Sequence, residues 1–357
     1  MVFTTGVIEG FYGRPWPWAE RTALLSELAR WGLDSYIYAP KSDRQLRRAW
    51  RQTWADDHAA AFGALRDRAA ALGIRFGVGF SPWGMQTSFG AADARALKAR
   101  IAQLNAFELD WLAILFDDMP GEGAGLADRQ ADIVETIMVA SNARRFAMCP
   151  SWYSDDPQLA ALFGPMPSGY LERLGQRLPP AVEVFWTGPQ VVSTHYAASH
   201  FADVSAALRR RPLLWDNYPV NDGRKISRFL HLLPLSGRPQ ALREWCSGHL
   251  LNPMNQPLLS RPALASQARL YQLESDAAPA VLQEWWREAL PALVGPATAR
   301  LLVRDAERFQ RDGLDALAAA ERSRLCQEYG AVGEPAAREV VEWLQEGYRF
   351  DPECLND

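Results

Sequence analysis

The chain has 357 residues, of which 48% are hydrophobic and 22% are charged, an ordinary balance for a globular protein. That length exceeds one small domain and suffices for a barrel of about 250 residues with an appended region. The formal net charge of −4 argues against nucleic acid or an anionic membrane as the main partner and favours a neutral or mildly polar one.

Short apolar runs alternate with segments of helical periodicity from the N-terminus to residue 251. Most of the intervening segments repeat apolar residues every three or four positions, as at Leu24, Leu28 and Trp31, and the pattern is weak only in the long last interval, 216–247. Alternating strands and helices predict a parallel sheet, and eight strands predict closure into a (β/α)8 barrel, an α/β fold of the TIM type. The expected strands are 2–8, 35–39, 74–80, 110–116, 145–149, 182–186, 211–215 and 248–251.

After residue 258 the strands stop and the pattern is helical. The first of these helices can close the barrel, and the rest form an appendix beside it. We therefore expect a barrel over residues 1–258 and a small C-terminal helical region over residues 259–357. The expected helices are 260–275, 279–290, 296–311, 313–329 and 334–348.

The chain shows no sign of export or membrane insertion. It begins MVFTTGVIEGFYG, without a basic segment followed by an apolar one, so we expect no signal peptide. Because no apolar run reaches the roughly 18 residues of a membrane span, we expect no membrane partner and a cytoplasmic location. The four cysteines lack CxxC spacing and the five histidines lack ligand spacing, which indicates neither a disulfide framework nor a zinc site.

Polar and aromatic residues follow nearly every expected strand. In a (β/α)8 barrel the carboxyl ends of the strands carry the active site. One such residue is uninformative, since Lys41 alone is more often a surface ion-pair partner and Trp215 alone is more often core. Together they predict a pocket of aromatics, carboxylates and amides that suits a sugar. They include Gly10, Lys41, Asp117, Asp118, Tyr153, Trp215, Asn217 and Asn252.

The strongest chemical signal is the pair of adjacent acids, Asp117 and Asp118, directly after the apolar run AILF. Retaining glycosidases ordinarily use two carboxyl groups about 5–5.5 Å apart across the scissile bond. The side chains of adjacent residues on a strand point in opposite directions, so an adjacent pair cannot easily place its two carboxyl groups on either side of one bond. They suit a division of labour in which one acid protonates the leaving oxygen and the other holds a 2-acetamido group of the substrate. An acid pair that binds Mg²⁺ or caps a helix is the alternative.

Six segments of the chain resemble, in order, the motifs of glycoside hydrolase family 84, which contains the O-GlcNAcases and bacterial N-acetyl-β-glucosaminidases. They span residues 6–254, the whole of the expected barrel. The segments are GVIEGFYGRPW at 6–16, YIYAPKSD at 36–43, ILFDDMP at 114–120, EVFWTGPQVVS at 183–193, LLWDNYPVND at 213–222 and LLNPM at 250–254.

The resemblance implies a role for each candidate residue. Asp117 would polarise the substrate acetamide, whose carbonyl attacks C1 to form an oxazoline, and Asp118 would be the general acid and then the base. The acetamide would be held by Tyr153 and Asn217, with Trp215 as a pocket wall. Asp222 and Asn252 would hold the 4- and 6-hydroxyls, and Gly10 and Lys41 would contact the 3-hydroxyl side. The reaction needs neither a metal nor an organic cofactor.

Three functions remain open at this point. The chain is an exo-acting O-GlcNAcase that removes terminal β-linked GlcNAc from glycoprotein, a hexosaminidase that acts on glycan or cell-wall fragments, or an inactive glycan-binding barrel. The intact acid pair argues against the third, because a lectin has no need of a general acid. The oligomeric state is not predicted.

Overall fold

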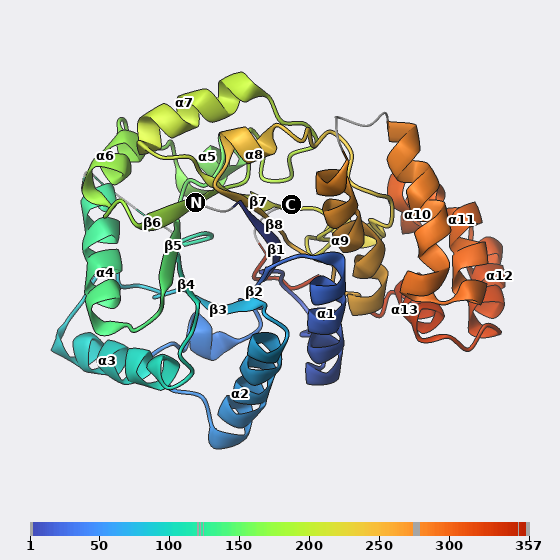
Figure 1. Cartoon of the computed structure of the whole chain (residues 1–357), viewed down its shortest axis with the longest axis horizontal. Helices are drawn as coiled ribbons and strands as arrows, with labels where there is room; N and C mark the ends of the chain where they lie inside the picture. Colours follow the sequence, from blue (N-terminus) through green and yellow to red (C-terminus); the bar gives the residue numbers. More distant parts are fainter. Residues whose placement is uncertain are drawn as a thin grey trace.

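The structure is a computed structural model and describes residues 3–119, 121, 123, 125–273, 279–348 and 350–354. Within these ranges eight parallel strands pair in chain order and β1 closes against β8, so the predicted (β/α)8 barrel is confirmed (Figure 1). The strands are β1 (Thr4–Glu9), β2 (Ser35–Tyr38), β3 (Arg75–Phe80), β4 (Trp111–Leu115), β5 (Arg145–Cys149), β6 (Val182–Trp186), β7 (Leu213–Asp216) and β8 (Gly248–Leu251).

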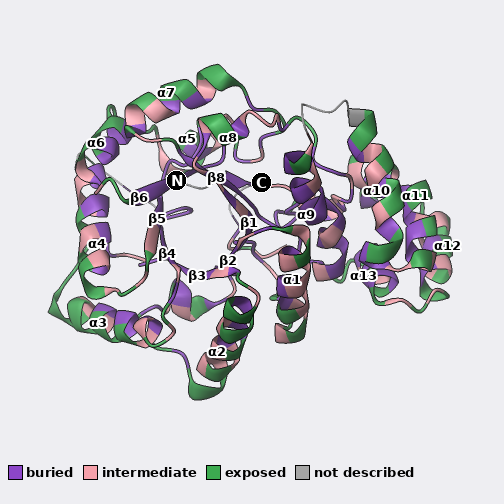
Figure 2. Ribbon diagram, viewed as in Figure 1, coloured by how far each residue is buried: buried purple, intermediate pink, exposed green. Residues whose placement is uncertain are grey.

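The observed strands agree with the expected ranges to within two residues. One difference of two residues is at the start of β7, which is expected from residue 211 and observed from Leu213. Pro212 explains it, because proline has no N–H to donate to a neighbouring strand. All but one or two residues of each strand are buried, as continuous apolar runs in a parallel sheet require (Figure 2).

Helices cover the outside of the barrel and expose only their outer faces (Figure 2). In the described part of the chain, none of the helices is long and apolar enough to cross a membrane. The helices between the strands are α1 (Trp18–Trp31), α2 (Asp56–Ala71), α3 (Ala91–Asn105), α4 (Leu126–Ala140), α5 (Pro157–Phe163), α6 (Tyr170–Arg177), α7 (Ala198–Leu208) and α8 (Leu242–Trp245).

The C-terminal helices form a group beside the barrel (Figure 1). The first, α9 (Pro257–Gln272), packs against α1 and β1 and covers the last gap in the outer ring. The others are α10 (Pro279–Val294), α11 (Pro296–Arg311), α12 (Ala319–Gly330) and α13 (Pro335–Leu344). They enclose a second hydrophobic cluster, to which the barrel loop residues Leu230, Leu232 and Met254 also belong. The division at residue 258 stays a prediction, since α9 contributes to both clusters.

Two buried ion pairs fix the carboxyl ends of strands. Glu9, the last residue of β1, accepts hydrogen bonds from Arg21 of α1 at 2.6 and 2.9 Å. Asp216, the last residue of β7, accepts from Arg238 at 2.7 and 2.9 Å and lies 2.9 Å from Nε2 of His249 on β8. Burial alone raises the pKa of Asp216, but the charge and hydrogen bonds of Arg238 and His249 hold it well below its usual value.

We expect Asp216→Asn to destabilise the barrel by about 3–5 kcal/mol, because it leaves the buried cation Arg238 without its carboxylate. The measurement is urea unfolding at pH 7. Asp315→Asn is the matched control, since Asp315 also pairs with an arginine, Arg228, at 2.7 Å but is 73% exposed. Equal losses in the two variants would contradict this role for Asp216.

Candidate active site

One narrow pocket lies at the carboxyl ends of the strands, and all nine candidate residues line it. They come from the ends of β1, β2, β4, β5, β7 and β8 or the loops that follow them, which is where a barrel of this kind places its active site. Their side chains and backbones thus meet although the sequence separates them by up to 242 positions. The nine are Gly10, Lys41, Asp117, Asp118, Tyr153, Trp215, Asn217, Asp222 and Asn252.

Asp117 is buried, and its two carboxylate oxygens have different surroundings. Oδ2 forms a short ion pair with Nζ of Lys41, which is also buried. Oδ1 is buried without a hydrogen-bond partner among the described residues, and Asp117 itself lines the pocket. A buried carboxylate oxygen without a donor is costly, so this atom indicates a place where a ligand N–H or O–H binds.

Asp118 lines the same pocket, although strand alternation would send neighbouring side chains to opposite faces. The alternation ends because β4 stops at Leu115 and the backbone of Asp118 has a φ of 55°. Asp tolerates this left-handed conformation better than most residues do. The expectation that the side chains of Asp117 and Asp118 point in opposite directions is therefore wrong, because the chain turns at Asp118.

Two phenol groups donate hydrogen bonds to the carboxylate of Asp118. The hydroxyl of Tyr12 lies 2.8 Å from Oδ2 and that of Tyr153 lies 2.9 Å from Oδ1. Burial, and then the charge of Asp118, raise the pKa of both tyrosines well above the usual value, so both hydroxyls keep their protons and act as donors. Each carboxylate oxygen of Asp118 therefore has its own phenol donor.

Amide groups form the wall between β1, β7 and β8. Oδ1 of Asn217 accepts from Nε1 of Trp215 and Nδ2 of Asn252, both at 3.0 Å, and Nδ2 of Asn217 donates to the Val191 carbonyl at 2.9 Å. Oδ1 of Asn252 accepts from the Gly10 N–H at 3.1 Å. A Cβ atom on Gly10 would lie 2.3 Å from the Trp215 ring, so only glycine lets that ring approach.

Asp222 is a third buried carboxyl group in the pocket. Its Oδ2 accepts from the Tyr12 N–H at 2.7 Å, and the thiol of Cys354 lies 4.0 Å from its Oδ1. Burial is the main reason that its pKa rises to about 6; the Tyr12 N–H opposes this shift and the nearby charge of Asp118 adds to it. Asp222 is therefore ionised at neutral pH and takes up a proton in mild acid.

Tyr12 and Arg47 are among the residues at this site that were not predicted from the sequence. Nη2 of Arg47 donates to the Tyr12 hydroxyl at 2.9 Å, and Arg47 is buried. Tyr12 lies two positions after Gly10 in the GFYGRPW segment, and this closeness to a candidate residue could have indicated that Tyr12 belongs to the site. No sequence pattern indicated that Arg47 belongs to the site, because it lies in a polar and irregular loop.

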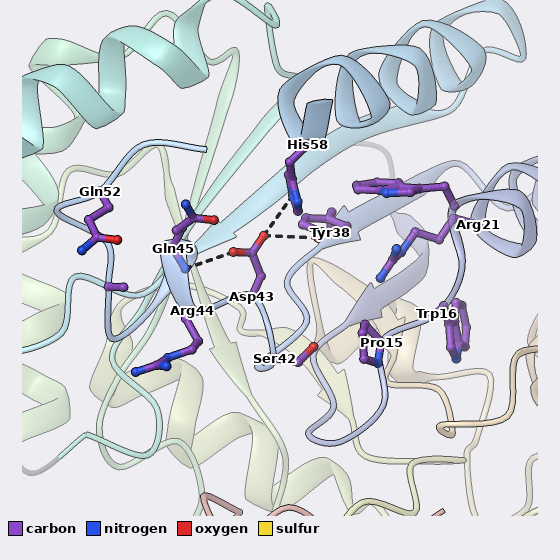
Figure 3. Close-up of a pocket in the computed structure, with 12 residues that line it drawn as sticks. Pro15, Trp16, Arg21, Tyr38, Ser42, Asp43, Arg44, Gln45, Gln52 and His58 are labelled. Carbon is purple, nitrogen blue, oxygen red and sulfur yellow. Dashed lines mark hydrogen bonds and ion pairs between the residues drawn. The ribbon is translucent and has the colours of Figure 1, made fainter. Parts of the chain in front are cut away.

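A second, wider cavity lies beside the loop after β2, between that loop and the helices α1 and α2 (Figure 3). It contains none of the nine candidate residues. Asp43 anchors this loop: it accepts from the Gln45 N–H at 3.1 Å and the Tyr38 hydroxyl at 3.2 Å, and lies 3.3 Å from Nε2 of His58. These contacts of Asp43 hold the loop 40–52, which also carries Lys41, against the barrel and α2.

The pocket offers acceptors from carboxylates, donors from phenols and amides, and an indole wall. This combination suits a neutral ligand that carries hydroxyl and amide groups. Among the residues that the structure describes, no three His, Cys, Asp or Glu side chains are grouped so that they could hold a metal ion.

Comparison with known proteins gives one family. The family model described as beta-N-acetylglucosaminidase matches residues 5–305. The protein O-GlcNAcases of Rattus norvegicus and Mus musculus are each 33% identical to this chain over 264 residues, or 70% of it. The chain spans only 28% of the length of these two curated relatives.

A solved structure has the same fold. It is a variant of the O-GlcNAc hydrolase of Thermobaculum terrenum, with a TM-score of 0.77 and 28% sequence identity. The similarity covers 96% of this chain and 81% of that one, so it includes the C-terminal helices as well as the barrel.

We expect Asp222→Asn to gain stability relative to the wild type as the pH rises. The unfolded carboxyl group ionises near pH 3.9 and the folded one near pH 6, so the folded wild type loses stability through this group between these values. The asparagine keeps the acceptor for the Tyr12 N–H and lacks this penalty, which reaches about 3 kcal/mol above pH 6. Urea unfolding of both proteins at pH 4.5 and 7.5 measures the difference, and a difference that does not grow with pH would contradict the assignment.

Proposed function

Because this chain belongs to the beta-N-acetylglucosaminidase family, glycoside hydrolase family 84, we propose that it is a retaining, exo-acting N-acetyl-β-D-glucosaminidase of the O-GlcNAcase type. It removes terminal β-linked GlcNAc from a glycan or glycoprotein. The substrate's own acetamide acts as the nucleophile, and the intermediate is an oxazoline.

One observation carries this proposal: Asp117 and Asp118 line one pocket, and Oδ1 of Asp117 has no hydrogen-bond partner among the residues that the structure describes. In a substrate-assisted reaction one carboxylate accepts the acetamide N–H while another group acts as the acid. The ion pair with Lys41 leaves Oδ1 as the atom that is available for that N–H. The polar wall of Asn217 and Asn252 supports hydrogen bonding to the rest of the sugar.

In the first step, the acetamide carbonyl oxygen attacks C1 and the bond from C1 to the leaving oxygen breaks. Asp118 gives its proton to that oxygen and becomes a carboxylate. The acetamide N–H strengthens its hydrogen bond to Asp117 as the oxazoline ring forms. Tyr12 and Tyr153 stabilise the new charge on Asp118, since their hydroxyls are already placed as donors to it.

In the second step, the Asp118 carboxylate takes a proton from water, and the water oxygen attacks C1 and opens the oxazoline. Two displacements at C1 retain the anomeric configuration. General acid–base catalysis of this kind typically contributes about 10²–10⁴-fold. The acetamide adds the advantage of a nucleophile held within the same molecule.

Other parts of the function stay predictions. Asp222 and Asn252 hold the 4- and 6-hydroxyls, Gly10 and Lys41 lie on the 3-hydroxyl side, and Tyr153 and Asn217 contact the acetamide, with Trp215 as a wall. The cytoplasmic location and the absence of nucleic-acid and membrane partners are also predictions. Asp118 with its two phenol donors argues against an inactive glycan-binding barrel, which needs no acid.

The first experiment is release of 4-nitrophenol from its N-acetyl-β-glucosaminide, with and without an N-acetylglucosamine-thiazoline that mimics the oxazoline. We expect turnover that the thiazoline abolishes, because analogues of an enclosed intermediate bind tightly. Turnover that is insensitive to the thiazoline would contradict acetamide participation. No turnover by purified, folded protein would favour the binding barrel or a different sugar.

The two acids should respond differently to substitution. We expect Asp118→Asn to lose about 10²-fold or more in kcat/KM on glycosides with poor leaving groups and much less on activated aryl glycosides, which need no protonation. We expect Asp117→Asn to be impaired on both, because the acetamide participates whatever the leaving group. Equal loss of Asp118→Asn on both substrates, or near-normal turnover by Asp117→Asn, would contradict these roles.

A further inference from the structure

The segment 350–354, which follows the C-terminal helices, lies against the rim of the active-site pocket. Oε2 of Glu353 lies 2.6 Å from Nη1 of Arg47 and 2.8 Å from Nε of Arg48. Cys354 is buried, and its thiol is 4.0 Å from Oδ1 of Asp222. A segment from beyond the barrel thus contacts Asp222 of the pocket and two arginines of the neighbouring loop.

The first of these contacts continues to the proposed acid. Glu353 accepts from Arg47, Arg47 donates to the Tyr12 hydroxyl at 2.9 Å, and that hydroxyl donates to Asp118 at 2.8 Å. A phenol has one proton, and its oxygen is occupied by the donor from Arg47. The proton of Tyr12 is therefore directed at Asp118, which keeps Tyr12 in the role of donor.

Glu353 is the carboxylate that Arg47 contacts directly, although the charges of Asp118 and Asp117 also act on its guanidinium. The Arg47 side chain is 3% exposed and lies over the rings of Tyr12 and Trp83, 5.2 and 4.7 Å from their centroids. Exposed ion pairs contribute little to stability, but loss of the carboxylate partner of a buried cation lets that cation turn toward other acceptors. The half-exposed Glu353 contacts Nη1 of Arg47 while Nη2 contacts the Tyr12 hydroxyl, so the two contacts together fix the orientation of the guanidinium.

The second contact fixes the other end of Tyr12. The Tyr12 N–H donates to Oδ2 of Asp222 at 2.7 Å, and Cys354 lies against the second oxygen of that carboxyl group. The segment 350–354 therefore acts on Tyr12 from both sides, through Arg47 at the hydroxyl and through Asp222 at the backbone.

We propose that Glu353 is a positioning residue for the catalytic acid: through Arg47 it holds the Tyr12 hydroxyl as a donor to Asp118 and so favours transfer of the proton of Asp118 to the leaving oxygen. This inference rests on the proposed function. It places part of the catalytic machinery in a segment outside the barrel, at residues that carry no motif of the family resemblance.

The test compares Glu353→Ala with the wild type on two N-acetyl-β-glucosaminides, one with an alkyl or 4-methoxyphenyl leaving group and one with 2,4-dinitrophenyl. We expect kcat/KM to fall about tenfold on the poor leaving group, a fraction of what general acid catalysis supplies, and less than about twofold on the good one. In a Tyr12→Phe background the same substitution should have no further effect, because the hydroxyl through which it acts is absent.

Glu342→Ala is the matched control, because Glu342 on α13 also joins the C-terminal region to a barrel loop, at Arg14, through a 2.5 Å ion pair. We expect it to leave both rates unchanged, and thermal unfolding to show that both variants are folded. Equal loss on the two glycosides, no loss, or the same loss in the Tyr12→Phe background would overturn the role of Glu353. A wild type that cleaves neither glycoside would instead overturn the proposed function, and this inference with it.

Discussion

Two adjacent carboxyl groups, Asp117 and Asp118, are buried at the end of β4, and the rest of the site follows from the need to give each its own partners. Buried carboxylates are tolerated only when cations or hydrogen-bond donors compensate for lost water. Lys41 from the loop after β2 pairs with Asp117, while Tyr12 and Tyr153 donate to Asp118. Among the described residues, Oδ1 of Asp117 is the one oxygen of this pair without a donor, and the proposed function assigns that atom to the substrate.

Asp117 and Asp118 have different hydrogen-bond and ion-pair partners, and this difference gives each carboxyl group its own environment. Asp117 pairs with the cation Lys41 through one oxygen, whereas both oxygens of Asp118 accept from neutral phenols. Two neighbouring residues of the same type thus differ in what surrounds them, which is how carboxyl pairs acquire separate roles in other hydrolases. The left-handed backbone of Asp118 makes this possible, because it turns the second carboxyl group into the pocket of the first.

Structures outside the pocket keep these partners in place. Asp43 fixes the loop that carries Lys41 and Arg47, and the ion pair of Asp216 with Arg238 fixes the end of β7 between Trp215 and Asn217. The C-terminal region adds α9 to the outer ring and returns the segment 350–354 to the rim. The C-terminal region therefore contacts residues at the barrel's pocket, although the hydrophobic clusters of the two regions are largely separate.

The amino-acid sequence determined the strands, the barrel and the residues around the pocket. Runs of buried apolar residues and helical periodicity arise from local patterns, and strand ends in a barrel share one face, so Gly10, Asp117 and Asn252 could be grouped without coordinates. Only the tertiary structure decided that Asp117 and Asp118 face the same way, since this depends on one backbone angle after β4. It alone joined Arg47 and Glu353 to Tyr12, because contacts between residues 306 positions apart depend on how the C-terminal helices pack and leave no periodic trace in the sequence.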